Sequence, residues 1–177
     1  RNRNSSPTIA PGLHTIAAGV VVAPEAQPSP FATISALVGD HPVPGRQSFA
    51  AAHRIGELAD GMRSDDVALV LISGGATSLI GAPMRGMNEA DLAQLYQLLL
   101  GSGLDIREMN AVRKRFTRWG GGRLALALAP ARTHALIISD VEGDDPADIA
   151  SGPCTPDAFS AHDVIGLLQR TGLYARV

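Results

Sequence analysis

The chain has 177 residues, of which 45% are hydrophobic and only 4% aromatic. A chain of this length buries about two thirds of its unfolded surface, so it can fold as one α/β domain without disulfides or a structural metal. The net charge of −2 provides no general attraction to nucleic acid or to an anionic membrane, and neither is expected as a partner.

The first half of the chain is predicted to contain strands and one helix. Residues 1–14 are polar and aperiodic and are expected to form a flexible start. Two runs rich in β-formers follow at residues 15–23 and 31–38. Apolar residues then recur at three- and four-residue steps over residues 47–62, which predicts a helix. Residues 67–72 form a short, continuously apolar run that is typical of a parallel strand buried on both faces.

Two helices in the middle of the chain are marked by their N-terminal capping residues. Asn88 is followed three residues later by Asp91, and Asp105 is followed three residues later by Glu108. In such pairs the first side chain accepts a hydrogen bond from the backbone N–H of the third helical residue. The second of these helices is expected to end at a glycine triplet, residues 120–122.

The last part of the chain is predicted to contain a strand, a long loop and a helix. The strand covers residues 134–139 and the helix residues 161–171, and the acidic loop between them is too long for a simple connector. The alternation of strands and helices predicts an α/β fold with a doubly wound, mostly parallel, Rossmann-like three-layer sheet. In such sheets ligands bind at the carboxyl ends of the strands.

The strand at residues 67–72 is followed directly by a run of glycines and hydroxyl residues: Ser73, Gly74, Gly75, Ala76, Thr77 and Ser78. Glycines allow a ligand to approach the backbone, and hydroxyls add hydrogen-bond donors, which suits a phosphate or carboxylate. A strand-to-helix turn with a Ser or Thr cap is the alternative. The run matches neither a Walker P-loop nor a Gly-x-Ser-x-Gly nucleophile elbow.

Basic residues gather at the end of the helix that begins after Asp105. They include Arg113 and Lys114, the latter being the only lysine of the chain. Cations complement the dipole at a helix C-terminus and commonly face water. Adjacent cations on a helix point in different directions, however, so at least one must face the protein body or a ligand. An anion-binding role for Arg113 or Lys114 and a solvated helix end both stay open.

The glycine triplet opens the sequence GGGRLA, which fits the loose dinucleotide pattern Gly-x-Gly-x-x-Ala. It follows a helix rather than a strand, so the context that this pattern requires is missing. We therefore do not interpret it as an NAD signature.

Five carboxylates lie within nine residues directly after the last strand: Asp140, Glu142, Asp144, Asp145 and Asp148. Concentrated negative charge is costly unless a cation or solvent relieves it, and oxygen-rich loops suit Mg²⁺ shared with substrate phosphates. A solvated acidic turn is the alternative. Asp140 is the first candidate for a metal-binding or catalytic role, because it lies at the end of the strand.

The remaining chemically active residues give weaker signals. His41, between Asp40 and Pro42, is the only histidine in a suggestive loop, but a lone histidine is more often structural. Cys154 has no neighbour that would activate it, so a packed thiol is expected. A single cysteine excludes an internal disulfide and a cysteine-rich zinc site, and it indicates a reducing compartment. A cytoplasmic location is therefore predicted.

Five motifs occur in a fixed order: GDHPVPG, LVLISGGATSL, DIREMNAVRKRF, GGGRLA and LIISDVEGDDPADIASGP. Together they resemble the glycerate 2-kinase family, whose members were formerly called hydroxypyruvate reductases. The match runs from about Gly19 to the last helix. The resemblance implies that residues 15–177 are a partial N-terminal α/β domain, incomplete relative to the family, and that the smaller C-terminal domain is absent. It also implies ATP-dependent phosphorylation of D-glycerate at its 2-hydroxyl, at a site between the two domains.

The resemblance also implies roles for the candidate residues. The run from Ser73 to Ser78 would cradle phosphate, and Arg113 and Lys114 would contact substrate or phosphate as catalytic residues. Asp140 and Asp144 would bind Mg²⁺, with Asp140 able instead to orient the reacting hydroxyl. The implied partners are D-glycerate and a nucleotide, and a homo-oligomer is left open.

The chain departs from the family pattern in four places. It lacks the upstream Gly-Lys-Ala segment, whose lysine is thought to be catalytic, and it lacks the second domain. SGGATS replaces the usual SGGGSA, and Gly120 stands where lysine is common. The chain alone is therefore expected to be inactive. The alternatives are a non-catalytic domain that binds an anion or nucleotide or serves in assembly, and a hydroxypyruvate reductase.

Overall fold

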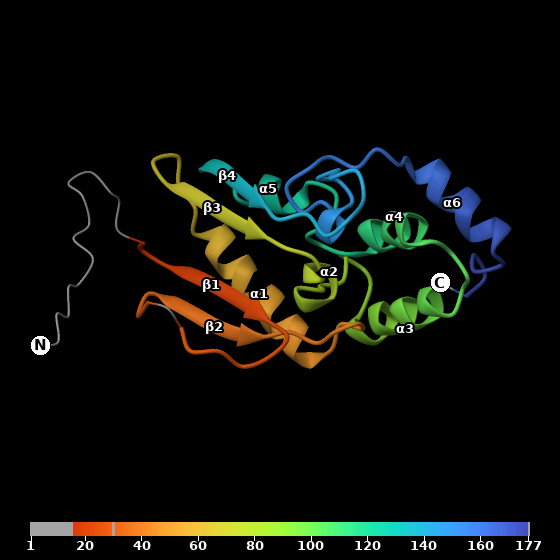
Figure 1. The fold of residues 1–177 in the computed structure, drawn as a ribbon, viewed down its shortest axis with the longest axis horizontal. Helices are drawn as coiled ribbons and strands as arrows, with labels where there is room; N and C mark the ends of the chain where they lie inside the picture. The colour runs from red at the N-terminus through yellow and green to blue at the C-terminus, as the bar shows by residue number, and fades with distance from the viewer. Residues whose placement is uncertain (1–15, 30, 177) are drawn as a thin grey trace, which may run out of the picture.

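A computed structural model describes residues 16–29 and 31–176 (Figure 1). The predicted flexible start, residues 1–14, lies outside the described residues. The described residues form an α/β fold in which strands and helices are interspersed along the chain.

The described strands are all parallel and form two pairs. β1 (Gly19–Ala23) pairs with β2 (Ile34–Val38), and β3 (Val67–Ile72) pairs with β4 (Arg132–Ile137). The predicted α/β class with parallel pairing is confirmed. The pairs are hydrogen-bonded as two separate two-stranded sheets among the described residues, and Figure 1 shows β1, β2 and β3 running in the same direction.

One helix, α1 (Arg46–Asp60), packs against both strand pairs. Its buried face consists of small residues, including Ala52 and Ala59, which pack with Ala68 of β3 and with Trp119. Small side chains allow the helix to approach the strands closely, as expected for a chain with few aromatic residues.

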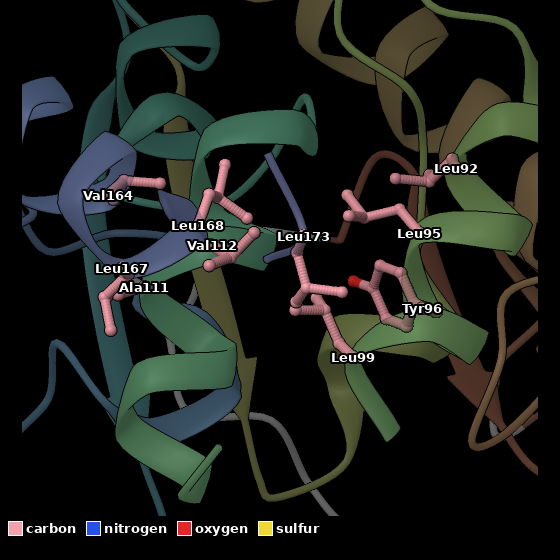
Figure 2. Close-up of a cluster of buried hydrophobic side chains, with 10 residues drawn as sticks. All are labelled: Leu92, Leu95, Tyr96, Leu99, Ala111, Val112, Val164, Leu167, Leu168 and Leu173. Atoms are coloured by element: carbon pink, nitrogen blue, oxygen red, sulfur yellow. The ribbon is translucent and has the colours of Figure 1, made fainter. Parts of the chain in front are cut away.

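A second core lies between three helices, α3 (Glu89–Leu100), α4 (Ile106–Phe116) and α6 (Ala161–Arg170). Figure 2 shows leucines and Tyr96 of α3 on one side of this core and side chains of α4 and α6 on the other. The predicted N-terminal caps of α3 and α4 are confirmed, since Asn88 accepts from Asp91 N and Asp105 and Glu108 form a capping box. No helix within the described residues is long and apolar enough to cross a membrane.

Three short elements connect these parts. α2 (Ala76–Leu79) follows β3, α5 (Arg123–Ala127) precedes β4, and a 3₁₀ turn, η1 (Ile149–Ser151), lies in the long acidic loop. Figure 1 places α2 beyond the tip of β3, between the strands and the helical core.

The prediction that β3 is buried on both faces is wrong. Its residues alternate, so that Ala68 and Ile72 are buried while Leu69 and Leu71 are 62% and 70% exposed. Leu136 of β4 is exposed in the same way. The continuous apolar run fits a strand between two covering layers, but among the described residues only one face of the β3–β4 pair is covered.

Candidate functional site

Three loops that follow strands meet at the carboxyl ends of β2, β3 and β4. We call them the loop cluster: residues 39–45, 73–81 and 139–152. A Cβ built on Gly39 would lie 2.4 Å from the carbonyl oxygen of Leu79, so the first loop touches the segment that follows β3. Thr77 Oγ1 lies 3.0 Å from Ser151 Oγ, so the third loop touches it as well.

A close approach within the loop cluster joins Gly74 and Asp140. A Cβ built on Gly74 would lie only 1.7 Å from Asp140 Oδ2 and 2.3 Å from Asp140 Cγ. Any side chain at position 74 would therefore occupy the space of the carboxylate. The structure thus brings together two features that the sequence predicted separately, the glycine-rich run and the first acidic residue.

Gly75 is required for a different reason. Its φ is +80° and its ψ is −12°, a left-handed conformation that favours glycine. A Cβ built there would lie 3.7 Å from Cδ2 and Nε2 of His41, which is ordinary van der Waals contact. Conformation rather than space therefore selects glycine at position 75. Within the described part of the chain, the backbone N–H groups of Gly74 and Gly75 donate to no acceptor.

The first loop of the cluster is anchored through Asp40. Asp40 Oδ2 accepts from the backbone N–H groups of Gln47 and Ser48 at 2.9 and 3.1 Å, and Asp40 N donates to Ser48 Oγ at 2.7 Å. Asp40 thereby caps α1, whose N-cap residue is a glycine without a side chain. Partial burial would raise the pKa of Asp40, but the hydrogen bonds from Ser48 and Gln47 outweigh burial and hold that pKa below its ordinary value.

The end of the acidic loop is tied to α4 by a chain of alternating charges. Lys114 Nζ lies 3.6 Å from Asp148 Oδ1 and 3.5 Å from Asp157 Oδ1, and the lysine side chain is only 2% exposed. Arg107 contacts the other oxygen of Asp148 at 2.9 Å, and Arg115 that of Asp157 at 3.5 Å. The two carboxylates are thus neutralised by this chain's own cations.

Arg113 also faces the protein body. Its guanidinium lies 4.7 Å from the centre of the Tyr96 ring, a cation–π contact. Its Nη1 donates to Asn110 Oδ1 at 3.3 Å, while its buried Nε has no partner among the described residues. Burial lowers the pKa of Arg113 below its ordinary value, but an arginine side chain remains charged at neutral pH. Arg113 and Lys114 therefore lie beneath the surface in this structure.

The glycine triplet serves as a packing surface for the acidic loop. The backbone N–H of Gly121 donates to Ser151 O at 3.0 Å, and that of Gly122 donates to Gly152 O at 2.8 Å. These amides are therefore engaged by protein carbonyls and are not directed at a dinucleotide. Arg123, next in the chain, donates to the carbonyl oxygens of Lys114 and Thr117.

The predicted site residues thus fall into two groups. The run from Ser73 to Ser78 and Asp140 lie together in the loop cluster, whereas the side chains of Arg113 and Lys114 are buried, and Lys114 contacts the cluster through Asp148. Asp144 is exposed on a turn with a φ of +52°. Sequence reasoning missed Asp157, the second partner of Lys114, and gave His41 only a weak signal, because both contacts join distant parts of the chain.

Two surface cavities, of about 460 and 590 Å³, border α6. Their walls include none of the predicted site residues. The candidate site is therefore defined by the chemistry at the strand ends rather than by a closed pocket.

The carboxylates of the loop cluster are its candidate ligands for a metal ion. Among the described residues, no group of three or more His, Cys, Asp or Glu side chains is arranged to hold a metal ion. Mg²⁺ in phosphate-handling sites needs only one or two protein carboxylates, with water and phosphate oxygens as its other ligands. Asp140, exposed in the loop just beyond the end of β4 at Ile137 and packed on Gly74, fits that requirement.

Comparison with known proteins gives the family. The family described as "Domain of unknown function (DUF4147)" matches residues 6–177. The chain belongs to this family. It is 42% identical over 155 residues to the "Putative hydroxypyruvate reductase" of Agrobacterium vitis, an alignment that covers 88% of this chain and 35% of that protein. It is 39% identical over 133 residues to the D-glycerate 2-kinase of Thermotoga maritima, covering 75% of this chain and 32% of that protein.

The fold of this family member is also found in a solved structure. The crystal structure of the glycerate kinase of Thermotoga maritima superposes with a TM-score of 0.80 at 36% identity, covering 88% of this chain and 38% of that chain. The resemblance drawn from the five motifs is confirmed. The chain spans about a third of the length of these relatives, whose covered shares are 35%, 32% and 38%.

Proposed function

We propose that the complete protein containing this chain phosphorylates D-glycerate at its 2-hydroxyl with ATP as the phosphate donor, and that the loop cluster forms one wall of the active site. The observation that carries the proposal is the contact between Gly74 and Asp140, which sets a carboxylate against a glycine turn whose amides donate to no acceptor among the described residues. The family relationship to proteins named glycerate kinase supports the choice of substrate. A cytoplasmic location is part of the proposal.

Phosphoryl transfer depends on positioning and on neutralising charge, which is the kind of task these residues suit. In the reaction the 2-hydroxyl oxygen bonds to the γ-phosphorus as the bond to the departing ADP oxygen breaks. Asp140 would accept the hydroxyl proton, or would hold Mg²⁺ while the proton leaves to water, and Asp144 would be a second ligand of Mg²⁺. Mg²⁺, when bound, neutralises charge on the phosphates. The free amides of Gly74 and Gly75 would donate to an oxygen of the phosphate.

Arg113 and Lys114 have indirect roles in this proposal. Because both side chains are buried, we propose that they position the loops rather than touch the reacting atoms. Lys114 holds the acidic loop through Asp148 and Asp157. Arg113 stacks on Tyr96, whose hydroxyl lies 3.5 Å from the carbonyl oxygen of Thr77.

The test is a kinase assay on the protein expressed from its complete open reading frame. Purified protein with ATP, Mg²⁺ and D-glycerate should form ADP and a phosphoglycerate. Phosphorus NMR of the product should show the phosphoryl group on the 2-oxygen. Absence of turnover in a folded protein, or a product phosphorylated on the 3-oxygen, would reject the proposal in this form.

The expected inactivity of the 177-residue chain by itself needs a separate test, because it depends on the segments that the chain lacks relative to the family and not on the reaction that the whole protein catalyses. A non-catalytic domain that keeps a nucleotide site should still show a higher melting temperature with ATP and Mg²⁺, since a ligand that binds only the folded state stabilises it. A chain with no such shift and no turnover would favour a role in assembly.

Hydroxypyruvate reduction is the second candidate, because the Agrobacterium vitis relative carries that name. The glycine triplet does not support it, since the N–H groups of Gly121 and Gly122 are taken by carbonyls of the acidic loop. Oxidation of NADH by the complete protein with hydroxypyruvate would establish this activity, and no change in absorbance would dismiss it.

A further inference from the structure

His41 lies next to the glycine turn that also contacts the acidic residue Asp140. The imidazole edge formed by Cδ2 and Nε2 is 3.7 Å from the position of a Cβ on Gly75, while Asp140 packs on the neighbouring Gly74. The two glycines are thus flanked by a carboxylate and by an imidazole. Neither neighbour follows from sequence spacing, because the three segments come after three different strands.

The position of His41 is fixed from both sides of the loop. Before it, Asp40 is held by hydrogen bonds to the first turn of α1. After it, the buried Pro44 packs against Gly81, where a built Cβ would lie 2.5 Å from Pro44 Cβ. The segment that carries the imidazole is therefore anchored although the residue itself is exposed.

The imidazole is nevertheless free to bind. Across residues 16–29 and 31–176, no hydrogen bond or ion pair engages the His41 side chain. The side chain is exposed, so its ring nitrogens reach solvent and are accessible to a ligand. An anchored, solvent-facing N–H donor beside the free amides of Gly74 and Gly75 is arranged for an oxyanion instead.

We propose that His41 is a ligand-contacting residue of this site, which donates a hydrogen bond from its ring to an oxyanion seated on the Gly74–Gly75 turn. The oxyanion is a phosphoryl group of the nucleotide or the carboxylate of the hydroxy acid. The assignment rests on the proposed kinase function. It adds one ligand-contacting residue, which comes from a loop outside the glycine-rich and acidic motifs.

The experiment uses the protein from the complete open reading frame and three variants. His41→Ala removes the donor, His41→Gln keeps an N–H donor at similar reach, and His53→Ala is the matched control. His53 is an exposed histidine of α1 whose only described partner is Glu57, at 3.4 Å. Calorimetric titrations with a non-hydrolysable ATP analogue and with D-glycerate, run separately, reveal which oxyanion His41 contacts.

His41→Ala should raise the Kd for one of these two ligands by about 10- to 100-fold, which is the effect of losing one hydrogen bond to a charged group. It should lower kcat/KM for that substrate by a similar factor without changing the melting temperature. His41→Gln should recover part of the loss, and His53→Ala should match the parent.

Two outcomes would overturn the assignment, and they are distinguishable. If the parent phosphorylates D-glycerate and His41→Ala keeps both Kd values within threefold, the role of His41 fails while the kinase function stands. If the folded parent binds neither ligand and shows no turnover, both the kinase function and the role of His41 fail.

Discussion

The two halves of the acidic loop both carry carboxylates, but those of the first half are exposed to solvent and those of the second half are nearly buried. In the first half Asp140, Glu142 and Asp144 are exposed and carry no ion pair within the described residues. Beyond it, Asp148 and Asp157 are only 12% and 8% exposed and share the amine of Lys114. Carboxylates paired inside the protein hold the loop in place, whereas carboxylates left in solvent remain available to a ligand.

Removal of the cation that Asp148 and Asp157 share should have the largest effect on stability. Lys114→Met should lower the free energy of unfolding by about 3–5 kcal/mol, because it leaves two nearly buried carboxylates without their common partner. Chemical denaturation of the complete protein measures the loss.

The control for that change is Arg107→Gln, at the exposed end of the same charge chain. Arg107 is 66% exposed, and a pair of this kind contributes about 0–1 kcal/mol. If Lys114→Met cost no more than Arg107→Gln, the buried pairs would not hold the loop, and a direct catalytic role for Lys114 would regain support.

The exposed half is tested by Asp140→Asn in the complete protein. The amide keeps the shape of the side chain but removes its charge, and we expect kcat to fall by about 10²-fold or more with little change in melting temperature. Glu142→Gln, two residues farther along the loop, should be nearly neutral. An Asp140→Asn enzyme with normal kcat and Mg²⁺ dependence would identify the first half as a solvated turn.

The contact between the glycine turn and the acidic loop is tested by Gly74→Ala. The new Cβ would overlap Asp140 Oδ2, so the variant should lose activity by displacing the carboxylate. Combined with Asp140→Asn it should cause little further loss, because two changes that remove one interaction are not additive. Additive losses in the double variant would show that Gly74 acts independently of Asp140.

Gly75 is a less informative position for such a test. Any L-residue at φ +80° is strained, at a cost of about 1–2 kcal/mol, so lost binding in Gly75→Val would not separate a blocked cradle from a distorted turn.

The smallest expected effect concerns the anchor of the His41 loop. Asp40→Ala should destabilise the protein by about 0.5–2 kcal/mol, the usual range for loss of a helix cap. The folded-state pKa of Asp40 lies below its ordinary value of 3.8, so this contribution is fully present above that value. It is lost as the pH falls through the lower folded-state pKa. Unfolding measured at pH 7 and at pH 2 should therefore show a smaller difference between parent and variant in acid.

Local patterns in the sequence predicted most elements of the fold. The caps at Asn88 and Asp105 depend on residues three positions apart, so the same chemistry that predicts them also forms them. The glycine-rich run and the acidic loop were recognised as candidate sites for a related reason, because each directly follows a strand.

Contacts between distant segments were decided only by the tertiary structure. Thr77 and Ser151, which are 74 residues apart, bring two loops together, and the burial of Lys114 depends on carboxylates far along the chain. The exposure of one face of β3 was also decided by the tertiary structure, because an apolar run predicts a strand but does not predict how many layers cover it. Periodicity and capping residues determined the helices and their N-termini, because these depend on short-range hydrogen bonds. The placement of His41 beside Gly75 and of Asp140 beside Gly74 was decided by packing, which periodicity does not encode.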